Sequence, residues 1–259
     1  MTETENRRLI LETEELGIDF GGLTAVNNLD LQVYDQEIVG LIGPNGAGKT
    51  TVFNLLTKVY QPTRGVIRLC GEDTAKMTTV EVNKAGIART FQNIRLFQNL
   101  SVLDNVLTGM HNEITYSPVD AVLRTRKYYT QERMVEEKAH DLLKILDLDE
   151  SADVAAGSLP YGAQRRLEIA RALATEPKLL LLDEPAAGMN PQETEELMDM
   201  IRFIRDHFKI AILLIEHDMR LVMGICERIT VINFGMMLAT GTPAEIQANP
   251  QVIKAYLGE

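Results

Sequence analysis

The sequence predicts an α/β fold with a substantially parallel sheet and an inserted helical region. Apolar stretches of strand length alternate with amphipathic stretches in residues 9–99 and again in residues 171–259. A glycine-rich loop joins one of these strands to a helix. Residues 100–170 show helical periodicity and no strand pattern. We therefore expect one domain over 1–259, with a core from 1–99 and 171–259 and a helical subdomain at 100–170.

The composition is that of a globular protein and excludes several classes. The 259 residues are 45% hydrophobic and 24% charged, which rules out disordered, collagen-like and disulfide-scaffold chains. Lys and Arg total 26 against 37 Asp and Glu, giving a net charge of -11. Such an acidic chain lacks the basic face that phosphate backbones need, so nucleic acid is not an expected partner.

Cysteine use and hydropathy indicate a cytoplasmic chain. Cys70 and Cys226 are far apart and show no metal-ligand spacing, so we expect two free, buried thiols in a reducing compartment. The polar stretch Met1–Arg8 does not resemble a signal peptide. The apolar runs at 179–182 and 210–215 are far shorter than the roughly 20 residues of a membrane span. Another chain would have to hold this one at a membrane.

The first third of the chain predicts strands around one loop-to-helix junction. Residues 9–33 favour short strands around the turn at 20–22. Residues 38–42 are an apolar strand, followed by a helix over about 49–58 and a strand over 66–69.

Two helix signals stand out in the middle of the chain. Ser101 precedes an apolar-periodic run and Asp104 follows three residues later, as in a capping box. A charged amphipathic helix is predicted over 131–148. Its apolar face is predicted to hold Met134, Ala139, Leu142, Leu143 and Leu146.

The last third returns to alternating strands and helices. Strands are predicted over 179–182, 210–215 and 229–232, with 236–239 returning as a hairpin. Asn190, Pro191 and Glu193 predict a helix start, and that helix should bury Leu197, Met200, Ile201 and Ile204. Thr242, Pro243 and Glu245 predict a last short helix.

Residues 43–50, GPNGAGKT, match the phosphate-binding pattern G-x-x-x-x-G-K-[ST] at every fixed position. Glycines let backbone N–H groups turn toward phosphate oxygens, and the N-terminus of the following helix favours negative charge. Lys49 should reach the β- and γ-phosphates of ATP, and the Thr50 hydroxyl should bind Mg²⁺. A chance glycine-rich turn is disfavoured, because an apolar strand precedes the loop and a helix follows it.

Two carboxylates end the apolar strand LLLL at 179–182. Open α/β sheets bind ligands at the carboxyl ends of their strands, which is where Asp183 and Glu184 lie. Asp183 is predicted to hold Mg²⁺, through water, and Glu184 to act as the general base for the attacking water. Four apolar residues and two acids are a weak signal alone and a strong one beside a complete phosphate loop.

Together these motifs resemble the nucleotide-binding subunit of ATP-binding-cassette (ABC) transporters, over the whole chain. The resemblance implies a P-loop ATPase core with a mixed sheet, an N-terminal antiparallel β-subdomain and an inserted α-helical subdomain. It implies that Phe20 stacks on adenine with Val26 beside the ring, that Gln92 senses Mg²⁺ and water, and that His217 is the switch histidine. The remaining nucleotide contacts that it implies are Asn45, Gly46, Ala47, Gly48 and Thr51.

Two segments depart from the family pattern. Where the family reads L-S-G-G-Q, residues 159–163 read LPYGA, so Pro160 replaces the serine that contacts γ-phosphate across a dimer. Tyr161 replaces a glycine and Ala163 the usual glutamine. Met189-Asn190 stands where the family usually has Leu-Asp. These changes weaken the half-site that the chain offers to a partner, which favours a heterodimer with a second ABC ATPase over a homodimer.

Several stretches resemble the ATPases of branched-chain amino-acid importers, the LivG type. They include residues 20–28, 88–97, 164–171, 184–191, 215–219 and 253–258, with a long helical insert around 115–129. The resemblance implies two integral-membrane permease subunits, a substrate-binding protein outside the membrane, and a peripheral location on the cytoplasmic face of the plasma membrane. An ATPase for other amino acids or amides, or for lipopolysaccharide export, is an alternative.

An apolar cluster near Gln92 suits a permease helix. Ile94, Leu96, Phe97 and Leu100 would line a groove of the helix-in-groove kind, although each is also typical of a core. Three other classes compete with the transporter ATPase. A soluble ABC ATPase acting on ribosomes or DNA is disfavoured by the single cassette, and a P-loop kinase leaves Gln92 and His217 unexplained. An interaction subunit with weak catalysis is consistent with the altered segment at 159–163.

Overall fold

The computed structural model describes residues 7–257. The first two strands of the chain belong to a four-stranded antiparallel sheet. Its strands run in the order β2-β1-β4-β5, with β1 Leu9–Phe20, β2 Leu23–Tyr34, β4 Arg64–Leu69 and β5 Glu72–Asp73. The expectation of short strands over 9–33 was wrong. β1 and β2 form one long hairpin, because register shifts such as the one between Thr13 and Leu16 bend the pair without ending it.

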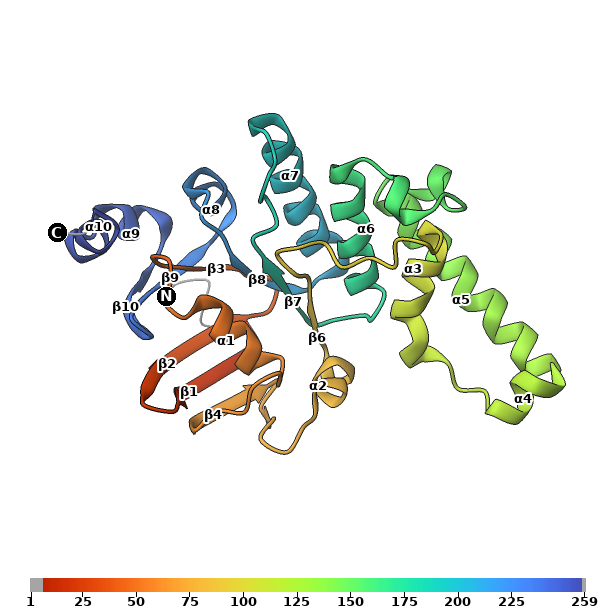
Figure 1. The fold of residues 1–259 in the computed structure, drawn as a ribbon, viewed down its shortest axis with the longest axis horizontal. Coiled ribbons are helices and arrows are strands. Elements are labelled where there is room, and N and C mark those ends of the chain that lie inside the picture. Colours follow the sequence, from red (N-terminus) through yellow and green to blue (C-terminus); the bar gives the residue numbers. More distant parts are fainter. Residues whose placement is uncertain (1–6, 258–259) are drawn as a thin grey trace. The chain divides into compact units, whose positions relative to one another are not determined.

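A second, mixed sheet of six strands carries the phosphate loop. Its order is β10-β9-β3-β8-β7-β6, and every neighbouring pair except β9–β10 is parallel (Figure 1). β3, β7 and β8 are buried along their whole length, as strands of a sheet covered on both faces are. The strands are β3 Ile38–Ile42, β6 Ile87–Arg89, β7 Leu179–Asp183, β8 Ala211–Ile215, β9 Arg228–Asn233 and β10 Met236–Gly241.

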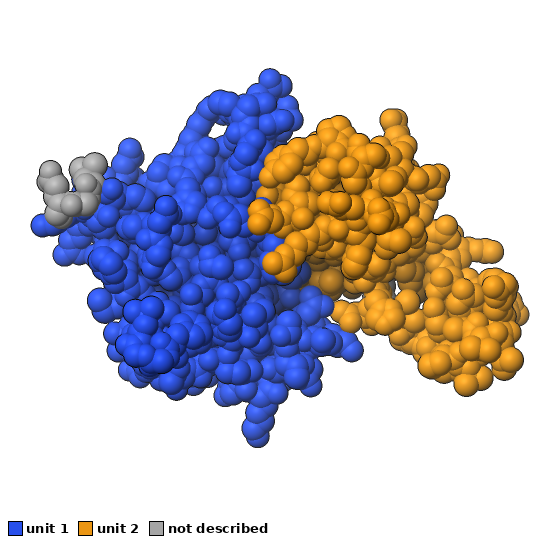
Figure 2. Space-filling view, in the orientation of Figure 1, with its two compact units in different colours: residues 1–92, 178–259 blue, residues 93–177 orange. Residues whose placement is uncertain are grey.

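The chain separates into two compact units, shown in two colours in Figure 2. Unit 1 comprises residues 1–92 and 178–259 and holds both sheets. Its helices are α1 Lys49–Leu56, α2 Thr79–Ala85, α7 Pro191–Phe208, α8 Met219–Ile225, α9 Pro243–Ala248 and α10 Pro250–Leu257. The buried face of α1, including Val52 and Phe53, joins strands of both sheets in one hydrophobic core. Packing against strands of both sheets therefore holds α1, the helix that follows the phosphate loop, in place.

Unit 2 comprises residues 93–177 and is helical. The segment 93–99 bonds to its helices: the backbone N–H of Phe97 donates to Asn105 Oδ1 at 3.0 Å, and that of Arg95 to Glu168 Oε1 at 3.2 Å. Unit 2 therefore begins before residue 100, where the sequence analysis placed its first boundary. Its helices are α3 Val102–Gly109, α4 Pro118–Leu123, α5 Arg126–Ile145 and α6 Tyr161–Leu173, with short 3-10 helices at Met110–Glu113, Asp149–Ser151 and Ala156–Ser158.

Most helix starts follow the capping residues that the sequence offers. Ser101 caps α3 by accepting from the backbone N–H of Asp104, and full capping boxes open α7 at Asn190 and α9 at Thr242. The helix predicted over 131–148 was misplaced, because Thr125 provides an earlier cap and α5 begins at Arg126. The strands predicted at 38–42, 66–69, 179–182, 210–215 and 229–232 and the returning strand at 236–239 are all present, within two residues at each end.

Several predicted side-chain positions were wrong. In α5, Val135 is buried and Met134 is exposed, and in α7 Met198 is buried where Met200 was expected. Cys226 is buried as predicted, but Cys70 is only half-buried. The predicted helix over 49–58 ends at Leu56, and α10 follows the helix that was expected to be last. Residues 1–6 of the polar N-terminal stretch lie outside the described residues.

None of the helices within residues 7–257 has the length and apolar character needed to cross a bilayer.

A buried ion pair organises unit 2. Arg165 Nη1 and Glu168 Oε2 are 2.8 Å apart on α6, and their side chains are 0% and 1% exposed. The same Glu168 carboxylate accepts the backbone N–H of Arg95. The pair therefore ties the segment after Gln92 to α6, and neither charge has water to replace a lost partner.

Removing one member of this pair should destabilise unit 2 strongly. For Glu168→Ala we expect a loss of about 3–5 kcal/mol in unfolding free energy, because Arg165 is left charged and buried. Urea denaturation followed by far-UV circular dichroism measures it. The control is Asp141→Ala, which breaks the exposed Lys144–Asp141 pair of α5 and should cost at most about 1 kcal/mol. Equal effects of the two substitutions would contradict the account.

Candidate functional site

Three loops meet at one edge of the mixed sheet. β3 pairs in parallel with β8, and β8 pairs in parallel with β7, so these strands end at the same edge. The phosphate loop follows Ile42 of β3, Glu184 follows β7, and His217 lies two residues beyond β8. Groups far apart in the sequence are thus assembled by strand register alone.

The phosphate loop wraps one side of a pocket of about 450 Å³. Gly48 has φ of 102°, and a Cβ there would lie 2.7 Å from the backbone oxygen of Ala25, so the loop needs glycine at this position. A Cβ at Gly46 would meet nothing within 4 Å, which leaves the backbone there open to a ligand. All seven predicted loop contacts line the pocket: Asn45, Gly46, Ala47, Gly48, Lys49, Thr50 and Thr51.

Lys49 is a buried cation inside this loop. Its ammonium donates to the backbone oxygens of Gly43 at 2.7 Å and Pro44 at 3.0 Å. Burial lowers the pKa of Lys49 below its usual value, and the nearby carboxylates of Glu184 and Asp183 offset part of that shift. An anion bound in the pocket would form a charge-assisted hydrogen bond with the buried ammonium of Lys49, which favours anion binding.

Glu184 is hydrogen-bonded to two of the other predicted catalytic side chains, Gln92 and His217. Its Oε2 accepts from Gln92 Nε2 at 2.6 Å, and its Oε1 lies 2.7 Å from His217 Nε2. When this carboxylate is ionised it can only accept, and the bond then uses a proton on Nε2 of His217. Glu184 itself has φ of 47°, an unusual value for a non-glycine residue that turns the chain sharply after β7. Glu184 and His217 both line the pocket.

Asp183 lies one residue earlier and is held by Arg89. Arg89 Nη2 donates to Asp183 Oδ2 at 2.7 Å, and both side chains are less than a tenth exposed. Arg89 also donates to Asn54 of α1 at 2.7 Å. The sequence analysis missed Arg89, because nothing local marks an arginine whose partner lies 94 residues away.

The oxygen groups here fit Mg²⁺ by their chemistry. Thr50 presents an exposed hydroxyl in the pocket and Asp183 a carboxylate at the same sheet edge. Mg²⁺ prefers oxygen ligands and takes one or two from protein while sharing the rest with phosphates and water. Within residues 7–257 no cluster of three or more His, Cys, Asp or Glu side chains could hold a metal. Thr50 and Asp183 thus have the chemistry to hold Mg²⁺ beside a bound nucleotide, whereas Gln92, the third predicted ligand, donates to Glu184.

Glu216 is a second buried acid that the sequence analysis did not assign. Its carboxylate accepts the backbone N–H groups of Ala186 at 2.7 Å, His217 at 2.8 Å and Asp218 at 3.3 Å. Burial raises the pKa of Glu216 above its usual value, and these three N–H groups oppose the shift. It ties the loop after Glu184 to the turn that carries His217. The sequence does contain one signal for Glu216, because this acid lies directly between a buried strand and His217.

Phe20 and Val26, the two side chains predicted to contact adenine, do not line the pocket in this structure. Phe20 is 43% exposed and packs edge-on against Tyr60 with ring centroids 5.2 Å apart. It does not line the pocket, although its cross-strand partner Leu23 does. Val26 is fully buried in the core, so its side chain is not open to a ligand. The exposed ring of Phe234, which the sequence analysis passed over, lies on the pocket wall.

The altered segment at 159–163 forms the start of α6. Pro160 is the N-cap residue of α6 and contributes no side-chain hydrogen bond. Tyr161 is exposed in the first turn, and a Cβ added at Gly162 would meet nothing within 4 Å. The start of α6 therefore offers backbone N–H groups without the serine hydroxyl of the family pattern.

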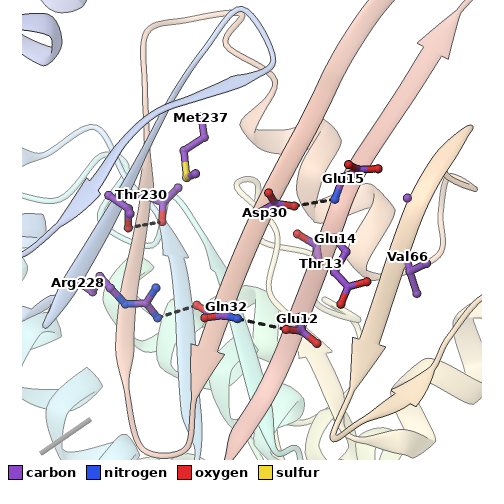
Figure 3. Close-up of a pocket in the computed structure, with 12 residues that line it drawn as sticks. Glu12, Thr13, Glu14, Glu15, Asp30, Gln32, Val66, Arg228, Thr230 and Met237 are labelled. Carbon is purple, nitrogen blue, oxygen red and sulfur yellow. Dashed lines mark hydrogen bonds between the residues drawn. The ribbon is translucent and has the colours of Figure 1, made fainter. Parts of the chain in front are cut away.

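A second cavity of about 670 Å³ lies between the antiparallel sheet and strands β9 and β10 (Figure 3). Four carboxylates line it, from Glu12, Glu14, Glu15 and Asp30. Arg228 is the one cation among the described residues that line it, and it is already paired with Glu37 at 2.8 Å. Negative charge repels phosphate, so the smaller pocket beside Lys49 is the better nucleotide site.

Comparison with known proteins agrees with the geometry. The family model described as ABC transporter matches residues 26–187, and the one described as Branched-chain amino acid ATP-binding cassette transporter matches residues 237–259. The chain is 49% identical to the high-affinity branched-chain amino acid transport ATP-binding protein BraF of Pseudomonas aeruginosa, covering 97% of this chain and 99% of BraF. It is 48% identical to the corresponding protein LivG of Escherichia coli K12, covering 96% and 98%.

A solved ATP-binding cassette of an ABC transporter, in its ADP conformation, superposes with a TM-score of 0.84 at 29% identity. The match covers 97% of this chain and 99% of that one. The chain therefore belongs to the ATP-binding cassettes of ABC transporters and is an ABC ATPase. Within that family, its full-length relatives and its C-terminal match place it with the branched-chain amino-acid group.

Glu216→Gln should lower ATP turnover without weakening ATP binding. The amide replaces one accepting oxygen, so the backbone beside Glu184 or His217 loses its anchor, and displacements of this kind cost up to about 100-fold in rate. We expect kcat for ATP to fall about 10- to 100-fold. KM should change little, since the phosphate loop does not contact Glu216. Steady-state phosphate release by the assembled complex measures both constants.

The matched control is Glu195→Gln on the exposed side of α7, where Glu195 pairs only with Arg220. It should leave both constants unchanged. A wild-type kcat for Glu216→Gln, or an equal loss in the control, would refute the positioning role.

Proposed function

We propose that this chain is the ATP-hydrolysing subunit that energises the import of branched-chain amino acids through an ABC transporter. The observation that carries the proposal is the hydrogen-bonded group of Glu184, Gln92 and His217 beside the loop of Lys49. The substrate class comes from the relatives, which are named as branched-chain amino acid transport ATP-binding proteins. The C-terminal match favours that class over export of lipopolysaccharide.

ATP binding would use the loop and the side chains already at the pocket. Lys49 would exchange its two backbone acceptors for oxygens of the β- and γ-phosphates, with backbone N–H groups of residues 45–51 completing the cradle. Thr50 and Asp183 would hold Mg²⁺, which neutralises charge on the phosphates when bound. Phe20 would stack on adenine from the tip of the β1–β2 hairpin, on the face it shares with Leu23.

Hydrolysis would require Glu184 to accept a proton from the attacking water. Each oxygen of Glu184 has one partner here, Gln92 on Oε2 and His217 on Oε1, and each can accept a second hydrogen bond. A water that attacks the γ-phosphate would bind at Oε2 beside Gln92 or in its place, and His217 would donate from Nε2 to the γ-phosphate. The bond between Gln92 and Glu184 would thus compete with the attacking water for Oε2.

The partners follow from the altered segment at 159–163. In the family, the phosphate loop of one chain meets the start of the equivalent α6 in the other. A second ATPase with an intact L-S-G-G-Q segment would complete the site described here, whereas two copies of this chain would form two weakened sites. Two permeases in the membrane, fed by a binding protein outside it, would hold this ATPase pair on the cytoplasmic face.

The permease contact would lie on unit 2. Phe97 and Leu100 are exposed, and Ile94 and Leu96 are half-buried. An apolar surface of this kind suits the short cytoplasmic helix of a permease. It follows Gln92 directly in the chain, so a helix docked there would sit next to the residue that occupies Glu184.

Glu184→Gln tests the catalytic role directly. The amide is isosteric with the carboxylate but does not accept a proton from water, so turnover should fall at least about 100-fold. ATP affinity, measured by equilibrium binding of a labelled nucleotide, should stay close to that of the wild type. Glu196→Gln, on the exposed face of α7, is the control and should keep full activity. Normal hydrolysis by the Glu184→Gln complex would exclude the role.

If the two ATP sites are unequal, substituting the phosphate-loop lysine in one ATPase subunit at a time should reduce ATP turnover by different factors. In a heterodimer, Lys49→Ala removes the ammonium group from the loop that faces the partner's intact segment, and turnover should fall about 100-fold. The same substitution in the partner's phosphate loop, which faces residues 159–163 of this chain, should cost less than about tenfold. Equal losses from the two substitutions would contradict the asymmetry while leaving the ATPase assignment intact.

A further inference from the structure

Unit 2 carries an arm whose exposed surface no described residue covers. The α4–α5 arm, residues 115–134, consists of α4, the turn after it and the first turns of α5. Figure 1 shows α4 at the end of α5 that lies away from α6, and Figure 2 shows this end of unit 2 as a projecting lobe. α4 has no buried residue at all. The arm is therefore not part of a hydrophobic core.

The apolar side chains of α4 form one exposed face. Val119, Val122 and Leu123 are 64%, 82% and 70% exposed, and their spacing of three and four residues places them side by side on the helix. Single exposed aliphatic residues are common on protein surfaces, but a helix that turns its whole apolar face to solvent is not. No described residue buries this apolar face, so an apolar partner outside the described chain would stabilise it.

The arm is also cationic in an acidic protein. It contains Arg124, Arg126, Lys127 and Arg133 against two carboxylates, while the whole chain has a net charge of -11. None of the three arginines forms an ion pair with any side chain in residues 7–257. Lys127 donates to the backbone oxygen of Thr115 at 3.0 Å. In the sequence, the carboxylates nearest to the arm are Glu113 before it and Glu136 and Glu137 after it.

The two acids of the arm are engaged by neutral donors. The Asp120 carboxylate accepts from the backbone and hydroxyl of Ser117 and from the Thr125 hydroxyl, and these bonds hold the pKa of Asp120 below its usual value. Glu132 accepts the Tyr116 hydroxyl at 2.6 Å, which raises the pKa of Tyr116 to about 12. The arm thus uses its carboxylates to hold its own shape and leaves its arginines for an external anion.

Aromatic packing stiffens the turn that presents these groups. The ring of Tyr128 packs edge-on against Tyr116 at 5.1 Å and against Tyr129 at 5.3 Å between centroids. Tyrosine is favoured where an apolar surrounding meets a polar one, since its ring is apolar and its hydroxyl is not. The arm therefore combines an apolar helix face, unpaired arginines and a tyrosine cluster within twenty residues of chain.

We propose that the α4–α5 arm binds the surface of an anionic lipid bilayer. Val119, Val122 and Leu123 enter the boundary between headgroups and acyl chains, and Arg124, Arg126 and Arg133 contact lipid phosphates. The negative charge of the rest of the chain does not prevent this, because exposed charges are screened beyond about 8 Å at physiological ionic strength. The arm would give the ATPase a membrane contact of its own, in addition to the permeases of the proposed function.

Co-flotation of the full chain with lipid vesicles tests the proposal. We expect binding to phosphatidylcholine vesicles that contain about 30% phosphatidylglycerol, much weaker binding to phosphatidylcholine alone, and release in about 0.5 M salt. The triple variant R124Q/R126Q/R133Q should bind the anionic vesicles about 100-fold more weakly. V122S/L123S should lose about tenfold or more. Because α4 buries nothing, neither variant should unfold, which circular dichroism checks.

The matched control removes three exposed cations elsewhere, in R8Q/K76Q/K84Q, and should bind like the wild type. Failure of the wild-type chain to float with anionic vesicles, or equal losses in control and arm variants, would overturn the proposal. So would arm variants that float normally and no longer co-purify with the permeases, since a protein would then cover the arm. The assay needs neither ATP nor permease, and ATP turnover of the complex in detergent should be unchanged in the arm variants, so the proposed function is tested separately.

Discussion

The site depends above all on the register of three fully buried parallel strands. β8 lies between β3 and β7, and their backbone hydrogen bonds fix how far each strand extends toward the common edge. A shift of one residue in any of them would turn Glu184 or the phosphate loop away from the pocket. Because the strands are apolar along their whole length, the core resists such a shift from both faces. The chemistry of the chain is therefore positioned by packing, and the polar groups only complete it.

The charged side chains that the site uses at that edge all have partners within the chain. Lys49 is satisfied by two carbonyl oxygens of its own loop, Asp183 by Arg89, and Glu184 by Gln92 and His217. These hydrogen bonds within the chain offset the free-energy cost of burying charged groups. Nucleotide phosphates and an attacking water would replace some of these bonds. In the proposed function, an exchange of partners at Glu184 would link the occupancy of the pocket to Gln92 and so to the segment after it, which the Arg165–Glu168 pair anchors to α6.

Features encoded locally could be predicted from the sequence, and features that depend on distant contacts could not. The strand and helix around the phosphate loop, the place of Asp183-Glu184 at the end of β7 and the caps at Ser101, Asn190 and Thr242 each depend on a few neighbouring residues, and they lie where the sequence predicted them. Arg89 gains its role from a partner 94 residues away, which no local pattern reveals. Glu216 lies directly after a buried strand, but its contact with Ala186 spans 30 residues. Val135 is buried and Met134 is not, because Val135 lies four residues before Ala139 and shares its helix face, whereas Met134 lies five residues before it.

Uptake of radiolabelled leucine into proteoliposomes tests the central claim most directly. The vesicles would contain this chain with its partner ATPase and permeases, with ATP supplied on the ATPase side and the binding protein on the other. The account predicts ATP-dependent accumulation of leucine that is lost when this chain carries Glu184→Gln and that valine and isoleucine compete for. ATP hydrolysis without leucine accumulation, or accumulation that is unaffected by Glu184→Gln, would contradict it.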